Sequence, residues 1–423
     1  MTTRLDPSGS GSARSARTAN AGRPALEALL PEARAALPDV VALRRRLHEN
    51  PELGLLLPDT QKAVLDALAP LDLELHTGGS TSAIVATLRG ARPGGTLLLR
   101  ADMDALPMPE HTGLPFASRY EDRMHACGHD AHVAMLVGAA GLLARRRDEL
   151  AGTVKLLFQP GEEGHGGARI LVEDEGLLAV TPAVDAAFAI HVDSTLPPGR
   201  IALRPGPMLA SADVLSIDLH GRGGHASMPH HAVDPIPVAC EIVLALQSFV
   251  TRRIDAFDPV VITITRLSGG TTTNVIPAAA NLLGTIRSTS ERARTAAHEG
   301  IRRVAAGIGA AHEVDVKVHI LPGYPVTVND APFIDFTRGV AAELLGERAV
   351  VDLPKPIMGA EDFSYVLQQV PGAIVFLGAR PPGEHAEPLH SSSMTIDEEA
   401  LATGVALHAA MALRWLAAHE TAG

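Results

Sequence analysis

The sequence predicts an α/β fold in which a mostly parallel sheet domain carries an inserted ferredoxin-like domain of order β-α-β-β-α-β. Three observations support this prediction. Short apolar runs alternate with helix-like segments in the first half of the chain, which is typical of parallel sheets covered by helices. A region with the order of the ferredoxin-like pattern follows. One more apolar run near the carboxyl terminus returns to the first pattern, and 423 residues exceed what one core usually organises.

The first domain is built from three predicted helices and five predicted strands. Apolar residues recur at helical spacing over residues 26–47, 60–68 and 131–147. Strands that are buried on both faces appear as unbroken apolar runs. Such runs lie at residues 83–88, 96–99, 154–158, 186–190 and 373–377.

The inserted domain is predicted from segments that alternate apolar and polar residues. Alternation predicts strands at residues 212–219, 260–267, 281–287 and 313–320. Helical spacing predicts helices at residues 235–253 and 290–308. We therefore expect a disordered tail over residues 1–23, a discontinuous main domain over 24–208 and 323–423, and an inserted domain over 209–322.

Composition excludes several classes of partner. The chain has 36 basic and 48 acidic side chains, a formal net charge of −12, which is opposite in sign to a nucleic-acid-binding surface. Two cysteines exclude a disulfide framework and favour a reducing compartment. The first 23 residues lack the apolar centre of a signal peptide, and no apolar stretch approaches the ~20 residues of a membrane helix. We expect a cytoplasmic protein with neither a nucleic-acid nor a membrane partner.

Ionisable side chains follow three of the predicted parallel strands. These side chains are Asp102 and Asp104, Glu162 and Glu163, and His191. Ligands of open parallel sheets bind beyond the carboxyl ends of the strands, so we expect these groups to converge. A single acid at a strand end is explained equally well as a solvated loop residue or as a functional residue. Three such ends together favour a functional site.

The segment MHACGHDAH, residues 124–132, has the spacing of metal ligands. Cys127 and His129 lie two residues apart in a loop that glycine loosens. Thiolate, imidazole and carboxylate ligands together suit zinc or another first-row transition metal better than magnesium or calcium. A buried inert thiol is the alternative for Cys127. His132 lies three residues after His129, and spacing alone does not choose between the two histidines.

Glutamate and histidine side chains elsewhere in the sequence suit the remaining roles. Neighbours in an extended loop point in different directions, so one residue of the Glu162–Glu163 pair can bind a metal while the other takes a proton from a metal-activated water. His225 lies in a glycine-rich loop and could donate to a developing oxyanion, although a plain turn explains it too. His390 follows the last core strand and could close the metal site.

Eight motifs together resemble the amidohydrolase family of hippurate hydrolases, N-acyl-amino-acid amidohydrolases and auxin-conjugate hydrolases, of the aminoacylase and carboxypeptidase superfamily. They follow the family's order from about residue 43 to residue 397. The motifs are RADMDALPMPE, MHACGHDAH, FQPGEEG, GGHASMPH, NVIP, GTIRS, GAEDFSYVL and PLHSS. The resemblance implies a catalytic domain with a dinuclear metal centre and an inserted lid domain that often dimerises.

The resemblance also implies a role for each matching residue. The metal ligands would be Cys127, His129, Glu163, His191 and His390. Glu162 would be the general base, and Asp104 would orient a ligand. His225 would polarise the scissile carbonyl, either in its own chain or in the site of a partner subunit. Asn274 and Arg287 would hold the substrate, with Arg287 forming a forked contact to its carboxylate.

We therefore expect a metal-dependent amidohydrolase that cleaves the amide bond of N-acyl or N-aroyl amino acids with a metal-activated water. The cofactor would be two divalent ions of manganese, zinc, cobalt or nickel. The partners would be a small-molecule substrate and further copies of the chain, as a dimer or tetramer. Two alternatives stay open: a dipeptidase or carboxypeptidase of related architecture, and a non-catalytic protein that binds a metal or senses a ligand.

Overall fold

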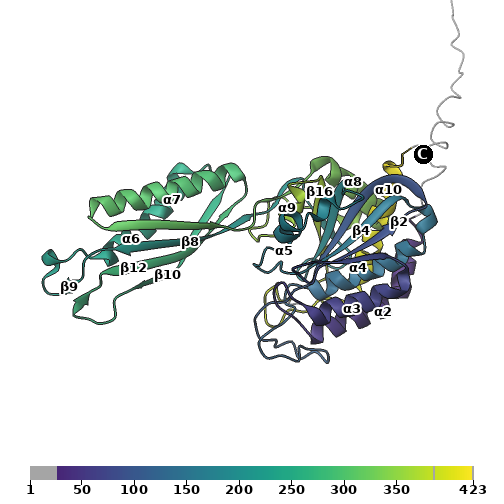
Figure 1. Ribbon diagram of the computed structural model, residues 1–423, viewed down its shortest axis with the longest axis horizontal. Helices are drawn as coiled ribbons and strands as arrows, with labels where there is room; N and C mark the ends of the chain where they lie inside the picture. The colour runs from purple at the N-terminus through teal and green to yellow at the C-terminus, as the bar shows by residue number, and fades with distance from the viewer. Residues whose placement is uncertain (1–25, 384–385, 422–423) are drawn as a thin grey trace, which may run out of the picture.

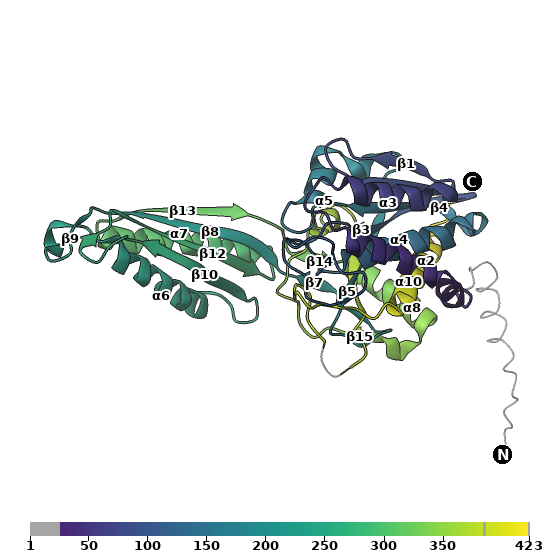
Figure 2. The same cartoon turned by 90° about the horizontal axis from the view of Figure 1, so that it is seen from below.

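The described residues, 26–383 and 386–421 of a computed structural model, form two bodies joined by narrow connections (Figures 1 and 2). The larger one, called the main body here, holds both ends of the described chain. The smaller one, called the outer module, extends from one side of it and contains the strands and helices between Ser211 and Pro322. The tail predicted over residues 1–23 lies outside the described residues.

An eight-stranded sheet forms the centre of the main body, in the order β1-β2-β4-β3-β5-β16-β6-β15. Its four central strands, β4, β3, β5 and β16, are all parallel to their neighbours within the group. The strands are β1 (Glu74–Thr77), β2 (Ile84–Arg89), β3 (Arg92–Asp102), β4 (Ala151–Gln159), β5 (Ala186–Asp193), β6 (Ile201–Leu203), β15 (Val350–Asp352) and β16 (Gly372–Gly378). All five strands predicted from apolar runs are present, and the parallel centre confirms the predicted fold class.

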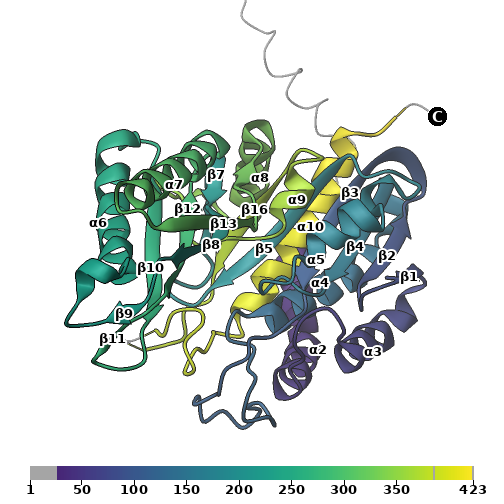
Figure 3. The same cartoon turned by 60° about the vertical axis from the view of Figure 1, so that its left-hand side comes forward.

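Helices cover the faces of this sheet (Figure 3). The three predicted helices are α2 (Leu29–Glu49), α3 (Pro58–Leu68) and α4 (His129–Ala144), and α2 and α4 pack against each other and against α10 (Ala400–Ala418). Helices α8 (Ala331–Leu345), α5 (Gly167–Arg169) and α9 (Ser364–Leu367) complete the main body. The predicted helix over 131–147 begins two residues earlier and ends three residues earlier, because Arg147 belongs to a separate 3₁₀ turn.

One expectation about apolar stretches is wrong. Among the described residues, α10 and α6 (Pro235–Arg253) have the length and hydropathy of a membrane span. In α10, every residue from Ala400 to Leu416 is buried inside the main body, as in the core helix of a globular domain. In α6, one apolar stripe packs on the sheet of the outer module through Val238, Ile242 and Leu246.

The outer module is a four-stranded antiparallel sheet in the order β10-β12-β8-β13 with two helices. Its elements follow the chain as β8 (Ser211–His220), α6, β10 (Val260–Gly269), β12 (Ala279–Ser288), α7 (Glu291–Ala311) and β13 (Asp315–Pro322). This is the predicted β-α-β-β-α-β pattern, and strand β8 alternates buried and accessible residues as a one-sided sheet requires. The assignment of residues 209–322 as a lid or dimerisation domain stays a prediction.

Short strand pairs lie at the two ends of the outer module. At its tip, β9 (Gly224–His225) pairs with β11 (Val275–Ile276). At its base, β7 (Gly206–Leu209) pairs with β14 (Thr327–Asn329), so the two chain segments that connect the bodies run side by side. The tip therefore lies far from the main body, and the base lies against it (Figure 2).

Candidate metal centre

The carboxyl ends of β3, β4 and β5 and the start of α4 bring the predicted ligands together. Glycine at position 128 makes this arrangement possible, because its φ of +84° turns the chain between Cys127 and His129. A Cβ atom at this position would lie 2.4 Å from Val192 Cγ2, so a larger residue would collide with β5. The loop therefore packs tightly against the strand that carries His191.

Five predicted ligands lie within reach of one another. Cys127 Sγ lies 3.5 Å from His191 Nε2 and 3.3 Å from His390 Nε2. Glu163 Oε1 lies 3.6 Å from His390 Nε2 and 3.9 Å from His129 Nε2. Ligand atoms of Cys127, His129 and His191 lie within 4.8 Å of one another, and so do those of Cys127, Glu163 and His390. The two groups share the cysteine.

Backbone carbonyls fix the ring nitrogens of two histidines. His129 Nδ1 donates to the Asp104 carbonyl at 2.8 Å, and His191 Nδ1 donates to the Val192 carbonyl at 2.7 Å. In each ring the Nε2 lone pair then points at the site, which is how a carbonyl partner prepares a metal-binding imidazole. His129 Nε2 and Glu163 Oε1 are both buried and have no hydrogen-bond partner among the described residues.

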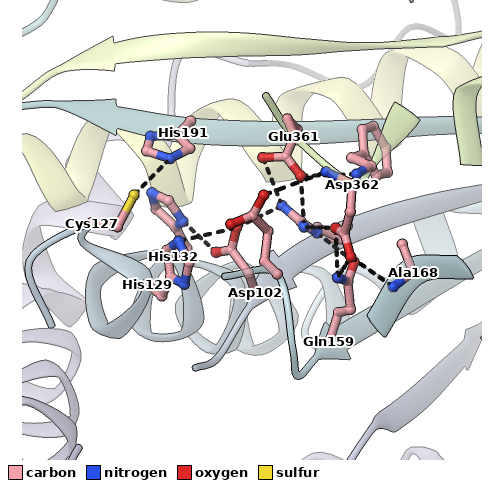
Figure 4. A network of polar contacts seen from close by, with 12 residues as sticks. Asp102, Cys127, His129, His132, Gln159, Ala168, His191, Glu361 and Asp362 are labelled. Atoms are coloured by element: carbon pink, nitrogen blue, oxygen red, sulfur yellow. Dashed lines mark hydrogen bonds and ion pairs between the residues drawn. The ribbon is translucent and has the colours of Figure 1, made fainter. Parts of the chain in front are cut away.

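His132 has no free nitrogen to offer. Its Nδ1 donates to Asp102 Oδ1 at 2.5 Å (Figure 4). Its Nε2 accepts from the Val192 amide at 2.8 Å. The sequence left His129 and His132 as equal candidates. The hydrogen bonds favour His129, because both nitrogens of His132 already have protein partners.

The electrostatics of the site also fit a cation. Burial raises the pKa of the Glu163 carboxyl to about 7, and burial raises the pKa of the Cys127 thiol well above its usual value. Burial lowers the pKa of His129, but the charges of Asp102 and Cys127 outweigh it and raise that pKa. Burial and the neighbouring charges thus favour protons on the thiol, the carboxyl and the imidazole, and a metal ion held by these groups would replace those protons. A sulfur, three imidazoles and a carboxylate fit first-row divalent metals.

Asp104 holds the backbone on which these ligands depend. Its Oδ1 accepts from the Glu162 amide and its Oδ2 from the Glu163 amide, each at 2.9 Å. Its backbone carbonyl is the acceptor for His129 Nδ1. One buried residue therefore fixes the directions of both glutamates and of one imidazole.

Glu162 lies beside the five predicted metal ligands without being one of them. Its carboxylate is buried and shares the neighbourhood of His129 and Glu163 on one side and of Glu361 and Asp362 on the other. The Asp362 amide donates to Glu162 Oε1 at 3.4 Å. Burial raises the pKa of the Glu162 carboxyl, and the charges of Glu361 and Asp362 raise it further. A carboxylate with a raised pKa is suited to accept a proton near neutral pH.

A buried guanidinium beneath the site was not predicted from the sequence. Arg100 on β3 donates to Asp102 Oδ2 at 2.7 Å, to Glu361 Oε1 at 2.9 Å and to Asp362 Oδ1 at 3.0 Å. Its Nε donates to Gln159 Oε1 at 2.9 Å. The signal in the sequence was an arginine inside an apolar strand, since a buried cation requires buried partners.

Three predicted residues lie on the outer module instead. His225 on β9 is exposed at the tip, and the Asn274 carbonyl beside it accepts from the Ala226 amide at 3.1 Å. Figure 1 shows that this tip points away from the main body. Arg287 lies at the other end of the module, on β12 opposite Ala212, and donates to Thr285 Oγ1. Within one described chain, the structure does not bring His225 and Asn274 to the metal ligands.

Known proteins are similar to this chain in sequence and in fold. Over 381 residues, the chain is 40% identical to a thermostable carboxypeptidase of Saccharolobus solfataricus, covering 89% of this chain and 95% of the relative. It is 39% identical to an N-acetylcysteine deacetylase of Bacillus subtilis, covering 86% of this chain and 93% of the relative. It is 36% identical to a hippurate hydrolase of Campylobacter jejuni, covering 88% of this chain and 96% of the relative.

A solved structure adds the metal chemistry. The crystal structure of a dinuclear metal-binding peptidase of Bacillus subtilis matches with a TM-score of 0.79 and 35% identity, over 90% of this chain and 99% of that one. The family model described as peptidase family M20/M25/M40 matches residues 98–414, which include every predicted ligand, the whole outer module and most of the main body. The chain belongs to peptidase family M20/M25/M40.

Proposed function

We propose that this protein is a metal-dependent amidohydrolase that cleaves the amide bond of N-acyl or N-aroyl amino acids to a carboxylic acid and a free amino acid. The observation that carries the proposal is the cluster of Cys127, His129, Glu163, His191 and His390 beside the buried carboxylate of Glu162. The names of the deacetylase and hippurate hydrolase relatives support this substrate class.

Two divalent ions are the cofactor in this proposal. His129 and His191 would hold one ion, Glu163 and His390 would hold the other, and Cys127 would contact both, because it belongs to both ligand groups. Manganese, zinc, cobalt and nickel all accept this set of ligands. When bound, such a pair supplies a water acidified toward a pKa of ~7 and polarises the substrate carbonyl.

The residues of the chain move the proton. Glu162 accepts the proton of the attacking water at its carboxylate and returns it to the leaving nitrogen when the amide bond breaks. Asp104 keeps that carboxylate in place through the Glu162 amide, and it keeps the neighbouring ligand in place through the Glu163 amide. Burial excludes bulk water from Glu162, which strengthens the electrostatic interactions around it.

The remaining parts of the proposal concern the outer module and the assembly. Residues 24–208 and 323–423 would form the catalytic domain, and residues 209–322 would form a lid through which copies of the chain associate as a dimer or tetramer. His225 and Asn274 would reach the site of a partner subunit, since the tip lies away from its own metal centre (Figure 1). Arg287 would hold the substrate carboxylate. We propose a cytoplasmic location.

A substrate panel tests the proposed function. Protein reconstituted with each of the four metals is assayed with acetyl, benzoyl, long-chain and indole-acetyl amino acids, and with free dipeptides and longer peptides. We expect hydrolysis of the acyl amino acids to exceed hydrolysis of the peptides, and Glu162→Gln to lower kcat by about 100-fold or more while metal content stays constant. Faster cleavage of peptides would favour the carboxypeptidase alternative, which the name of the thermostable relative supports.

A further inference from the structure

The two connections between the bodies meet at Tyr324, which follows β13. The Ala212 amide on one connection donates to the Tyr324 carbonyl on the other at 3.0 Å. Below this contact, β7 and β14 continue the pairing into the main body. If the outer module rotates relative to the main body, the backbone next to Tyr324 must therefore change its conformation.

On the side of the outer module, a buried carboxylate holds this connection. Asp213 accepts from Arg294 Nε at 3.0 Å, from His298 Nε2 at 2.6 Å and from the Gly323 amide at 3.1 Å. Arg294 also donates to the Gly323 carbonyl at 3.1 Å. Both polar groups of the residue before Tyr324 are thus fixed to helix α7 and strand β8.

On the side of the main body, the phenol of Tyr324 reaches the loop that follows β4. Its hydroxyl donates to the Glu162 carbonyl at 2.6 Å and accepts from the Gly166 amide at 3.1 Å. Its ring packs edge-on against Tyr365, with the ring centres 6.3 Å apart. Burial raises the pKa of the Tyr324 hydroxyl, with Asp362 and Glu162 adding to the rise, so the group stays a donor at neutral pH.

We propose that Tyr324 is a positioning residue that couples the orientation of the outer module to the backbone of Glu162. The proposal rests on the proposed function, because it assigns Glu162 a catalytic task. The hydrogen bond from Tyr324 to the Glu162 carbonyl helps to hold the plane of the peptide that joins Glu162 to Glu163. The Gly164 amide donates to the same carbonyl at 2.7 Å, and Asp104 accepts from the Glu163 amide of that peptide. Rotation of that plane moves the proton acceptor relative to the substrate, and a displacement of about 1 Å can reduce a rate by 100-fold.

The first test removes one oxygen atom. In Tyr324→Phe the ring stays, and the Gly166 amide loses its acceptor. We expect kcat for N-benzoylglycine to fall by about 3- to 10-fold with less change in KM, while metal content and melting temperature stay near the wild-type values. Hydrogen exchange at the Gly166 amide should become faster. Tyr365→Phe is the matched control, because among the described residues its hydroxyl donates to the Gly323 carbonyl alone, at 3.4 Å.

The second test asks whether the outer module acts through this hydroxyl. Asp213→Asn weakens the anchor on the module, and we expect it to lower kcat in the wild-type background. In the Tyr324→Phe background the same change should have a smaller effect, with a coupling of about threefold or more in kcat. If Asp213→Asn does not fold, His298→Gln weakens the same anchor from a half-buried position and replaces it in the cycle.

The outcomes separate this proposal from the proposed function. Additive effects on kcat, or a Gly166 amide that exchanges as slowly in Tyr324→Phe as in Tyr365→Phe, would overturn the coupling. A wild-type protein that hydrolyses no acyl amino acid would overturn the proposed function, and Tyr324 would then have no catalytic step to position. In Tyr324→Phe, faster amide hydrogen exchange confined to residues 162–168 together with a lower kcat would support the coupling and the proposed function.

Discussion

At the scale of single residues, hydrogen-bond partners show which of two neighbouring histidines has a ring nitrogen available for a metal, which the sequence alone does not show. His129 and His132 lie three residues apart on the same turn of α4. One ring has its Nε2 free, and the other has both nitrogens occupied by Asp102 and the Val192 amide. The pattern of residues gives the spacing of a pair, but the direction of each ring depends on β3 and β5, which are distant in sequence.

This difference predicts two different metal-binding defects. His129→Gln removes a ligand, so we expect the metal content to fall by about one equivalent per chain even in excess metal. His132→Gln disturbs only the surroundings of the ligands and should weaken metal affinity by about 10- to 100-fold, with full loading restored at high metal concentration. Mass spectrometry of the metal content during a titration measures both. Equal stoichiometric loss in the two variants would contradict the assignment.

Arg100 predicts a large effect on stability from one buried charge. Its guanidinium is the cation that faces Asp102, Glu361 and Asp362, so its removal leaves buried carboxylates without their partner. Arg100→Met should lower the free energy of unfolding by about 3–5 kcal/mol, as measured by urea denaturation. Arg89→Met is the matched control on β2 of the same sheet, because its pair with Glu74 is exposed and should contribute little. Similar losses in both variants would show that burial of the pair does not matter.

At the scale of elements, charged side chains join α2 to the beginning of α4. His48 on α2 contacts Asp130 at 2.8 Å and Glu110 at 3.2 Å, and Arg44 one turn earlier contacts Asp130 at 2.9 Å. Burial lowers the pKa of His48, but these two carboxylates outweigh burial and raise it to about 9. The helix that carries His129 is therefore held at its first turn by a protonated imidazole and a guanidinium.

The raised pKa predicts how stability depends on pH. Since the folded pKa of about 9 exceeds the ordinary value of 6.5, the contribution of His48 is complete below pH 6.5 and is lost as the pH rises through 9. His48→Gln should lower the melting temperature at pH 6, and the difference from the wild type should shrink by pH 9.5. Thermal unfolding between these values measures it. A difference that grows with pH would contradict the pairing.

The spacing of apolar residues predicted the elements that have one solvent-exposed face or consist of a continuous apolar run. The five predicted strands of the main sheet and the six predicted elements of the outer module appear close to their expected residues. Helix α10 was missed because every residue from Ala400 to Leu416 is buried, so no polar face marks its period. Short strands such as β6 and β15 were missed because three residues carry too little pattern.

The candidate site was predicted in part. The resemblance supplied the five ligands and Glu162, and the structure gathers them at one place. The contacts of Tyr324 and Arg100 could not be predicted from the sequence. They include pairs of residues more than 150 positions apart, and only the fold decides which buried groups pair. The roles of His225, Asn274 and Arg287 stay predictions.

At the scale of the whole molecule, the length of the outer module separates His225 from the metal centre of its own chain. If His225 serves a partner subunit, two inactive variants should restore each other. Glu162→Gln spoils its own site, and His225→Ala spoils the site of its neighbour, so a mixed dimer has one complete site. Coexpression in equal amounts should give about a quarter of the wild-type activity. Activity no higher than that of either variant alone would place His225 in its own chain or outside the reaction.

Cys127 belongs to both groups of predicted ligands, so oxidation of this one residue would disrupt both of them. Cys127 is buried, whereas Cys240, the other thiol of the chain, is exposed. A bulky alkylating reagent should therefore label Cys240 and spare turnover. A peroxide molecule that reaches Cys127 would convert its sulfur to an oxyacid and so remove the thiolate from both ligand groups at once.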